Sequence, residues 1–239
     1  MNLGDNLHRV QDRIANAAAR AGRDPISIVL VAVSKTQPVE SLLEAYALGV
    51  RHFGENRVEE AAIKIPAFKQ ALPGLSAVFH MIGHLQSRKA EDAATLFNRV
   101  HSVDSLKLAQ RLDRFAAAQH KVLPILLEVN VSGEVSKYGF DHARREELFS
   151  AVESIAHLTH VHLEGLMTMA PLVADSEQAR PVFGGLRELR AALEAKVASV
   201  RLPQLSMGMT DDFEVAIEEG ATLVRIGRAI FGEGMQDKG

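Results

Sequence analysis

Short apolar runs rich in β-branched residues alternate with amphipathic stretches along this 239-residue sequence, and this alternation limits the possible folds more than any other feature. The clearest run covers residues 28–33 and is apolar without a break, which is typical of a strand buried on both faces. Similar runs predict further strands at residues 50–53, 78–82, 100–103, 125–131, 162–166, 204–206 and 222–226. Helices are predicted between them at residues 38–48, 56–70, 87–97, 105–119, 141–156, 176–200 and 211–219.

Strict alternation of strands and helices implies an α/β fold with a parallel sheet and helical crossovers. Eight such units predict a single (β/α)8 TIM barrel, and 239 residues match the ~250 that this fold needs. An open, doubly wound sheet is the alternative, because periodicity does not distinguish a closed sheet from an open one. No G-x-G-x-x-G motif follows the first strand, which weakens a dinucleotide-binding interpretation. An additional amphipathic helix is predicted before Gly22, and the lack of a linker predicts one domain over residues 1–239.

The composition excludes several classes of function. The chain has no cysteine, which excludes disulfides, thiolate metal sites and a cysteine nucleophile, and which fits a reducing compartment. A net charge of −3 gives no general attraction to nucleic acid or to an anionic membrane. The apolar runs are too short to span a bilayer, and the N-terminus has no apolar segment of the kind found in secretory signals. We therefore expect a soluble, cytoplasmic protein.

Lys35 is the most suggestive residue at the carboxyl end of a predicted strand, where barrels of this kind carry their chemistry. It follows the buried run 28–33, so we expect it to emerge where solvent is restricted and a neutral amine is favoured. A neutral amine can attack a carbonyl carbon and form a Schiff base. The alternative is a lysine that only extends to solvent at the rim.

Glycine-containing turns follow the last two predicted strands, and in barrels these two loops frequently bind phosphate through backbone N–H groups. Ser206 adds a hydroxyl donor there, while Gly208 and Gly227 allow a close approach of the backbone. The alternative is that both are tight turns that any barrel needs. Together with Lys35, a phosphate site would indicate a phosphorylated carbonyl compound as the ligand.

The histidines do not form a convincing metal site. His80 and His84 have H-x3-H spacing, but the first falls inside a strand and the second beyond it, so they do not share a helical face. A zinc site needs three convergent ligands with oriented partners. We therefore predict no metal.

The same strand ends carry a resemblance to a known family. The matching stretches occur in order from residue 31 to residue 232. They are VAVSKTQP (31–38), HFGENRVEE (52–60), IGHLQSRK (82–89), SVDSLKLA (102–109), VNVSGEVSKYGF (129–140), LEGLMTMAP (163–171), LSMGMTDDFEVAIEEGAT (205–222) and VRIGRAIFG (224–232). Together they resemble the YggS/PROSC family of pyridoxal-phosphate homeostasis proteins.

This resemblance implies a fold-type III barrel like the N-terminal domain of bacterial alanine racemase. It implies that Lys35 holds pyridoxal 5′-phosphate as an internal aldimine and that Arg225 faces the pyridine nitrogen of the cofactor. The other implied cofactor-binding residues are Ser206, Gly227 and the backbone of Arg228 at the phosphate, and Asn56 and Met207 along the ring. The family usually has threonine where this chain has Arg228, and commonly tryptophan where it has Phe79.

An arginine opposite the pyridine nitrogen has a chemical consequence. It has no acceptor, so it donates to an unprotonated ring nitrogen, and such a ring is a poor electron sink. Racemisation also needs a second base, which the racemases obtain as a tyrosine with the help of a C-terminal domain. The tyrosines here are Tyr46, in a predicted helix, and Tyr138, in a loop, and the chain has no length for a second domain.

We therefore expect a monomeric cofactor-binding protein with no catalytic residues, which holds pyridoxal phosphate reversibly on Lys35 and delivers it to apo-enzymes. Lys137 is a candidate second lysine that would receive the aldehyde during release, although a solvated loop charge is the favoured interpretation. Two alternatives stay open. One is a weak amino-acid racemase, and the other is a class I aldolase without a cofactor, which Arg225 disfavours.

Overall fold

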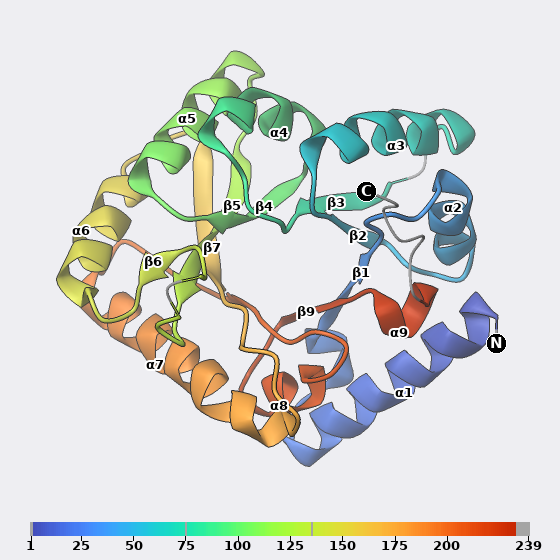
Figure 1. Cartoon of the computed structure of the whole chain (residues 1–239). Helices are drawn as coiled ribbons and strands as arrows, with labels where there is room; N and C mark the ends of the chain where they lie inside the picture. Colours follow the sequence, from blue (N-terminus) through green and yellow to red (C-terminus); the bar gives the residue numbers. More distant parts are fainter. Residues whose placement is uncertain (1, 75, 135, 233–239) are drawn as a thin grey trace.

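Eight parallel strands form a closed barrel in the computed structural model, which describes residues 2–74, 76–134 and 136–232 (Figure 1). Their order is β4-β3-β2-β1-β9-β8-β7-β5, and the pairing of β4 with β5 closes the ring. The strands are β1 (Val29–Val33), β2 (His52–Glu55), β3 (Val78–Met81), β4 (Arg99–Val103), β5 (Leu123–Asn130), β7 (Val161–Met167), β8 (Gln204–Ser206) and β9 (Leu223–Ile226). The predicted (β/α)8 barrel is confirmed, and the open sheet is excluded.

Helices surround the barrel on its outside (Figure 1). The α-helices are α1 (Leu3–Arg20), α2 (Val39–Ala47), α3 (Val58–Ala71), α4 (Ala90–Leu96), α5 (Leu106–Ala118), α6 (Arg145–Ala156), α7 (Arg180–Lys196), α8 (Phe213–Glu218) and α9 (Arg228–Phe231). Short 3-10 turns are η1 (Pro25–Ser27), η2 (Ser87–Lys89) and η3 (Ser176–Ala179). The helix predicted at 141–156 starts later, because β6 (Phe140–Asp141) pairs with the end of β5 instead.

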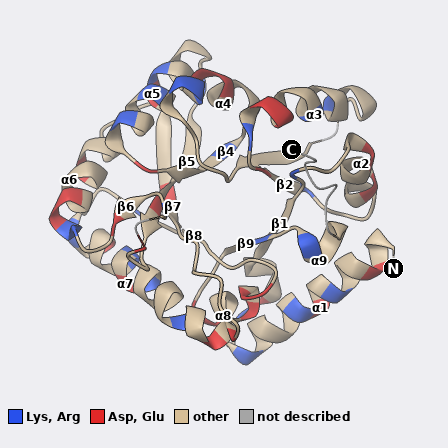
Figure 2. Ribbon diagram, in the orientation of Figure 1, with Lys and Arg blue, Asp and Glu red and all other residues tan. Residues whose placement is uncertain are grey.

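The strands bury both faces, in two separate apolar layers. Ala32, Phe53 and Phe79 point outward and join the large core between the strands and the helices. Val31 and Leu126 belong to a small cluster inside the barrel. Because successive side chains along a strand alternate between faces, these two clusters fix which residues of each strand point into the barrel. Most charged residues lie on the outer helices (Figure 2).

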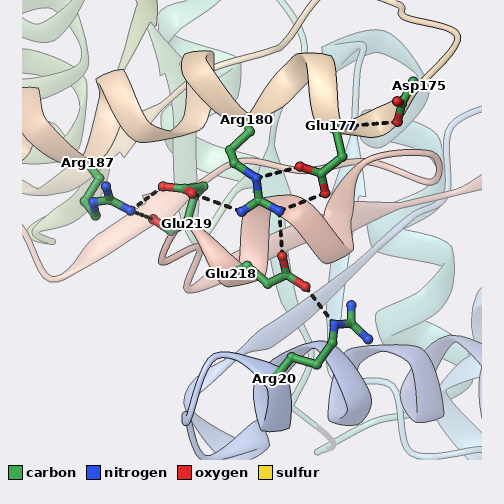
Figure 3. Close-up of polar contacts among 7 residues, drawn as sticks. All are labelled: Arg20, Asp175, Glu177, Arg180, Arg187, Glu218 and Glu219. Carbon is green, nitrogen blue, oxygen red and sulfur yellow. Dashed lines mark hydrogen bonds and ion pairs between the residues drawn. The ribbon is translucent and has the colours of Figure 1, made fainter.

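The N-terminal helix α1 is attached to the last third of the chain. Its apolar face, which includes Leu7 and Val10, is buried in the large core. A polar network then links α1 to α7 and α8 at the surface (Figure 3): Arg20 bonds Glu218 at 2.8 Å, and Arg180 bonds Glu218 at 2.7 Å and Glu219 at 3.0 Å. The additional helix thus connects the N-terminal segment with the C-terminal third of the chain. Among the described residues, no helix is long and apolar enough to cross a membrane.

Candidate functional site

Lys35 lies at the mouth of the barrel, just beyond the end of β1. Alternation along the strand places it on the same face as Val31 and Val33, which point into the barrel. Its side chain is exposed, so the expected restriction of solvent is not seen. The reason is its position in the turn after the strand, beyond the last hydrogen-bonded pair between β1 and β2.

A cavity of about 230 Å³ opens beside Lys35. Its lining comes from the end of β1 with the turn after it, and from α9 with the residue on each side of it: Val33, Lys35, Thr36, Gln37, Gly227, Arg228, Phe231 and Gly232. The fold therefore brings Lys35 together with Gly227 and Arg228, which the sequence analysis expected at one site. A Cβ atom on Gly227 would lie 3.1 Å from the carbonyl oxygen of Val33, so a side chain there would crowd the cavity wall.

Arg225 lies inside the barrel, one layer below Gly227. It is 4% exposed and pairs with Val31 across the sheet. Its Nη1 donates to Ser206 Oγ at 2.7 Å, and its Nη2 donates to the carbonyl oxygen of Thr168 at 2.9 Å. Burial lowers the pKa of Arg225 to about 10, so the guanidinium is still a cation at neutral pH. A guanidinium has five N–H donors, and these two contacts do not exhaust it.

A line of histidines runs through the barrel interior to Ser206. His52 Nδ1 lies 3.0 Å from His80 Nε2, and His80 Nδ1 lies 2.9 Å from His101 Nε2. His101 Nδ1 then lies 2.8 Å from Ser206 Oγ. Burial holds the pKa of both His80 and His101 well below 6.5, so both rings are neutral. A neutral ring has one donor and one acceptor nitrogen. Each histidine can therefore donate to one neighbour and accept from the other, and Ser206 connects the line to Arg225.

Ser206 and Met207, which the resemblance also implies at the cofactor, lie deeper in the fold than Lys35. Ser206 is fully buried, and its hydroxyl bonds His101 and Arg225 inside the barrel. Met207 is fully buried as well, and its side chain points outward into the core beneath the helices. The reason is strand alternation: Ser206 continues the inward face of β8, and Met207 therefore falls on the opposite face.

Asn56 follows β2 and is half-buried at the mouth of the barrel. The loop after β3 packs directly against it, since a Cβ atom on Gly83 would lie only 2.3 Å from the carbonyl oxygen of Asn56. Any side chain at Gly83 would displace Asn56. The position of Asn56 is compatible with the role that the resemblance implies for it.

Arg228 joins the loops that follow β8 and β9. Its guanidinium bonds both carboxylate oxygens of Asp211, at 2.7 and 2.5 Å, and both side chains are exposed. Gly208 starts the turn after β8 with φ +91°, and a Cβ there would lie 2.6 Å from that of Ala216. Thr210 lies in the same turn and is half-buried.

Glu128 is a residue that the sequence analysis missed. It is 3% exposed and follows Leu126 on the inward face of β5. Burial raises the pKa of Glu128 to about 7, and the Arg225 charge opposes that shift. Among the described residues its Oε2 has no hydrogen-bond partner. Its signal in the sequence was a carboxylate at an inward position of an otherwise apolar strand.

The remaining candidate, Lys137, lies in the loop after β5. Its Nζ is 3.8 Å from a carboxylate oxygen of Glu134, and the neighbouring Tyr138 ring stacks on His84 at 3.7 Å. The histidines considered for metal binding have other contacts: His80 bonds its neighbours in the line, and His84 lies against Tyr138. Within the described part of the chain, no three histidine or acidic side chains are placed to bind a metal ion.

Comparison with known proteins gives one consistent family. Residues 6–234 match the family model of the alanine racemase N-terminal domain. A pyridoxal phosphate homeostasis protein of Pseudomonas aeruginosa is 44% identical over 230 residues, covering 96% of this chain and 95% of the relative. The protein of the same name from Aquifex aeolicus is 43% identical over 233 residues, covering 98% and 99% of the two chains.

Solved structures agree with this. The structure of PipY from Synechococcus elongatus with PLP bound has 39% sequence identity and a TM-score of 0.80, and it covers 92% of this chain and 100% of PipY. An alanine racemase of Clostridium difficile has a TM-score of 0.72 at 17% identity. This chain matches 58% of that racemase, so the likeness concerns the barrel fold alone.

Proposed function

Since this chain belongs to the family of pyridoxal phosphate homeostasis proteins, we propose that it binds pyridoxal 5′-phosphate reversibly at the barrel mouth and serves its intracellular supply. One observation carries the proposal: a buried arginine cation lies one layer below a cavity that contains a lysine and a glycine turn. The cofactor has an aldehyde, a pyridine nitrogen and a phosphate. The lysine matches the aldehyde, the arginine matches the pyridine nitrogen, and the glycine turn matches the phosphate.

The residues present fit the cofactor. Arg225 keeps donors beyond its contacts with Ser206 and Thr168, and a pyridine nitrogen is an acceptor. The backbone at Gly227 and Arg228, which line the cavity, is suited to the phosphate. Asn56 would border the ring. Lys35 would hold the aldehyde carbon: its nitrogen adds to that carbon, a C=N bond replaces C=O, and the oxygen leaves as water.

We further propose that the protein holds the cofactor without using it. Arg225 donates to the ring nitrogen and has no acceptor, so it keeps the ring unprotonated and limits its capacity as an electron sink. Lys35 holds the cofactor through one reversible C=N bond at an exposed position. Water can hydrolyse that bond and release the cofactor. Delivery to apo-enzymes and a monomeric state are parts of this proposal.

A transfer assay tests the proposed function. The protein is loaded with pyridoxal phosphate, freed of unbound cofactor, and mixed with the apo-form of a pyridoxal-phosphate-dependent enzyme. We expect that enzyme to gain activity, and a Lys35→Ala protein taken through the same loading steps to transfer none. A loaded protein that never activates an apo-enzyme would contradict the delivery role.

A weak amino-acid racemase is the second candidate, because Glu128 is a buried carboxyl with a pKa near neutrality inside the same barrel. Such a group can accept and return a proton at neutral pH. Racemisation of several amino acids by the loaded protein, lost in Glu128→Gln, would favour this candidate over a holding role.

A further inference from the structure

Helix α3 sends a buried lysine, Lys64, to the turn that carries Lys35. Lys64 is 6% exposed. Its Nζ donates to the carbonyl oxygen of Ser34 at 2.6 Å, to Glu60 Oε1 at 2.7 Å and to Glu55 Oε1 at 2.8 Å. An ammonium group has three donors, so these contacts use all of them. Lys64 is therefore a fixed cation under the turn and is not available as a competing amine.

Glu60 bonds the other side of the same turn. One oxygen, Oε1, accepts both from Lys64 and from the backbone N–H of Thr36, the latter at 2.6 Å. The two peptide groups that flank Lys35 are thus both held by α3: the carbonyl of Ser34 before it and the N–H of Thr36 after it. The direction of the Lys35 Cα–Cβ bond depends on these two peptides.

The backbone of Thr36 shows that this turn needs support. Its φ is +61°, in the left-handed region that β-branched residues avoid. Such a conformation persists only where its surroundings hold it, and here the Glu60 carboxylate bonds its N–H. Glu55 completes the support, since it accepts from the Ser34 hydroxyl at 2.7 Å as well as from Lys64.

We propose that Lys64 and Glu60 are positioning residues that aim Lys35 at the aldehyde of its ligand. This inference rests on the proposed function, in which the Lys35 nitrogen adds to the aldehyde carbon and water leaves. Addition requires the amine to approach that carbon closely and along a narrow range of directions. A lysine on an unsupported, exposed turn would spend little time in that geometry, while a turn held on both sides presents it.

The test separates attachment from binding. Two quantities are measured for each variant: the rate of growth of the visible Schiff-base band with excess pyridoxal 5′-phosphate, and the affinity for pyridoxine 5′-phosphate, which has the ring and phosphate but no aldehyde. In Lys64→Met and Glu60→Ala we expect the rate to fall about tenfold while the affinity for the alcohol is unchanged. Glu60→Gln keeps an acceptor for the Thr36 N–H, so it should recover most of the rate.

Lys69→Met is the matched control, because Lys69 is an exposed lysine on the same helix. It should behave as the wild type in both measurements. Wild-type rates in Lys64→Met and Glu60→Ala would overturn the inference, and so would a parallel loss of rate and alcohol affinity, which indicates collapse of the site. If Lys64→Met fails to fold, Glu60→Ala decides, since Glu60 is partly exposed.

A measurement without any ligand distinguishes this inference from the proposed function. Amide exchange of Thr36 should be slow in the wild type and faster in Glu60→Ala, because only the wild type bonds this N–H to a carboxylate. Equal exchange in both would contradict the positioning role. A wild type that never attaches pyridoxal phosphate at Lys35 would refute the proposed function. It would also refute the positioning of Lys35 for that reaction, even where the difference in amide exchange is found.

Discussion

Arg225 donates a hydrogen bond of 2.7 Å to the hydroxyl of Ser206 inside the barrel. Because arginine has no acceptor, this contact makes Ser206 Oγ an acceptor, and His101 lies 2.8 Å away on its other side. The cation therefore has neutral hydrogen-bond partners at Ser206 and at the Thr168 carbonyl oxygen. Neither partner is a carboxylate, although the carboxyl groups of Asp212 and Glu128 lie close enough to act on its charge.

This predicts that Arg225 recognises the pyridine nitrogen. The wild type should bind pyridoxal phosphate about tenfold more tightly than an analogue with carbon at the ring-nitrogen position, the difference expected for a hydrogen bond to a charged group. In Arg225→Gln the two affinities should converge. Equal discrimination in both proteins, measured by titration of the visible band, would assign the ring nitrogen to another partner.

The buried histidines predict a loss of stability in acid. The unfolded chain binds a proton at His101 near pH 6.5, while burial holds the pKa of folded His101 well below that value. Between those two pKa values the unfolded state binds more protons, so stability falls as pH decreases, by about 1.4 kcal/mol per pH unit for one such group. Denaturant unfolding at several pH values should give a shallower dependence below pH 6.5 for His101→Gln. His157→Gln, at an exposed position after α6, is the control and should leave the dependence unchanged.

Arg180 predicts a salt-sensitive attachment between α7 and α8, which Arg20 extends to α1. It bonds Glu177, Glu218 and Glu219, and Glu218 also bonds Arg20 (Figure 3). Because these groups are partly exposed, we expect Arg180→Met to lower the free energy of unfolding by only about 1 kcal/mol at low salt and by less at high salt. Arg144→Met, which removes only the contacts with Asp141 and Glu147 near the start of α6, should have a smaller effect. An effect independent of salt would show that packing, not charge, is responsible.

The contact between Arg228 and Asp211 predicts that the Arg228 guanidinium contributes little to phosphate binding. The Asp211 carboxylate offsets its charge, since both oxygens accept from Nη2, at 2.7 and 2.5 Å. Arg228→Thr keeps the backbone N–H and replaces the side chain with the hydroxyl that is usual in the family, so pyridoxal phosphate affinity should stay within the same order of magnitude. A loss of tenfold or more, equivalent to about 1.4 kcal/mol, would show instead that the guanidinium binds the phosphate.

The parts of the fold that could be predicted from the sequence are those with a residue pattern contained in one continuous segment. The run 28–33 predicts β1 because a strand buried on both faces is apolar throughout, whereas the two residues of β6 have no such pattern. Lys35 and Gly227 were placed at one site because the carboxyl ends of barrel strands meet at one face, and they line one cavity.

The features that the sequence did not show have a common physical origin. Ser206 and Met207 are adjacent, and a strand turns adjacent residues to opposite faces. One side chain therefore lies inside the barrel and the other in the outer core, which the resemblance alone did not show. The line of histidines needs the relative register of β2, β3 and β4, which no single segment contains. The support by Lys64 depends on how α3 is rotated against β1, and tertiary packing decides that rotation.

The central claim is that Lys35 is the residue that holds the aldehyde. The most direct measurement is borohydride reduction of the protein with pyridoxal 5′-phosphate, followed by peptide mapping of the modified lysine. The account predicts modification at Lys35, loss of the visible band in Lys35→Ala, and an unchanged band in Lys137→Ala. Modification at another lysine in the wild type, or a visible band that persists in Lys35→Ala, would contradict it.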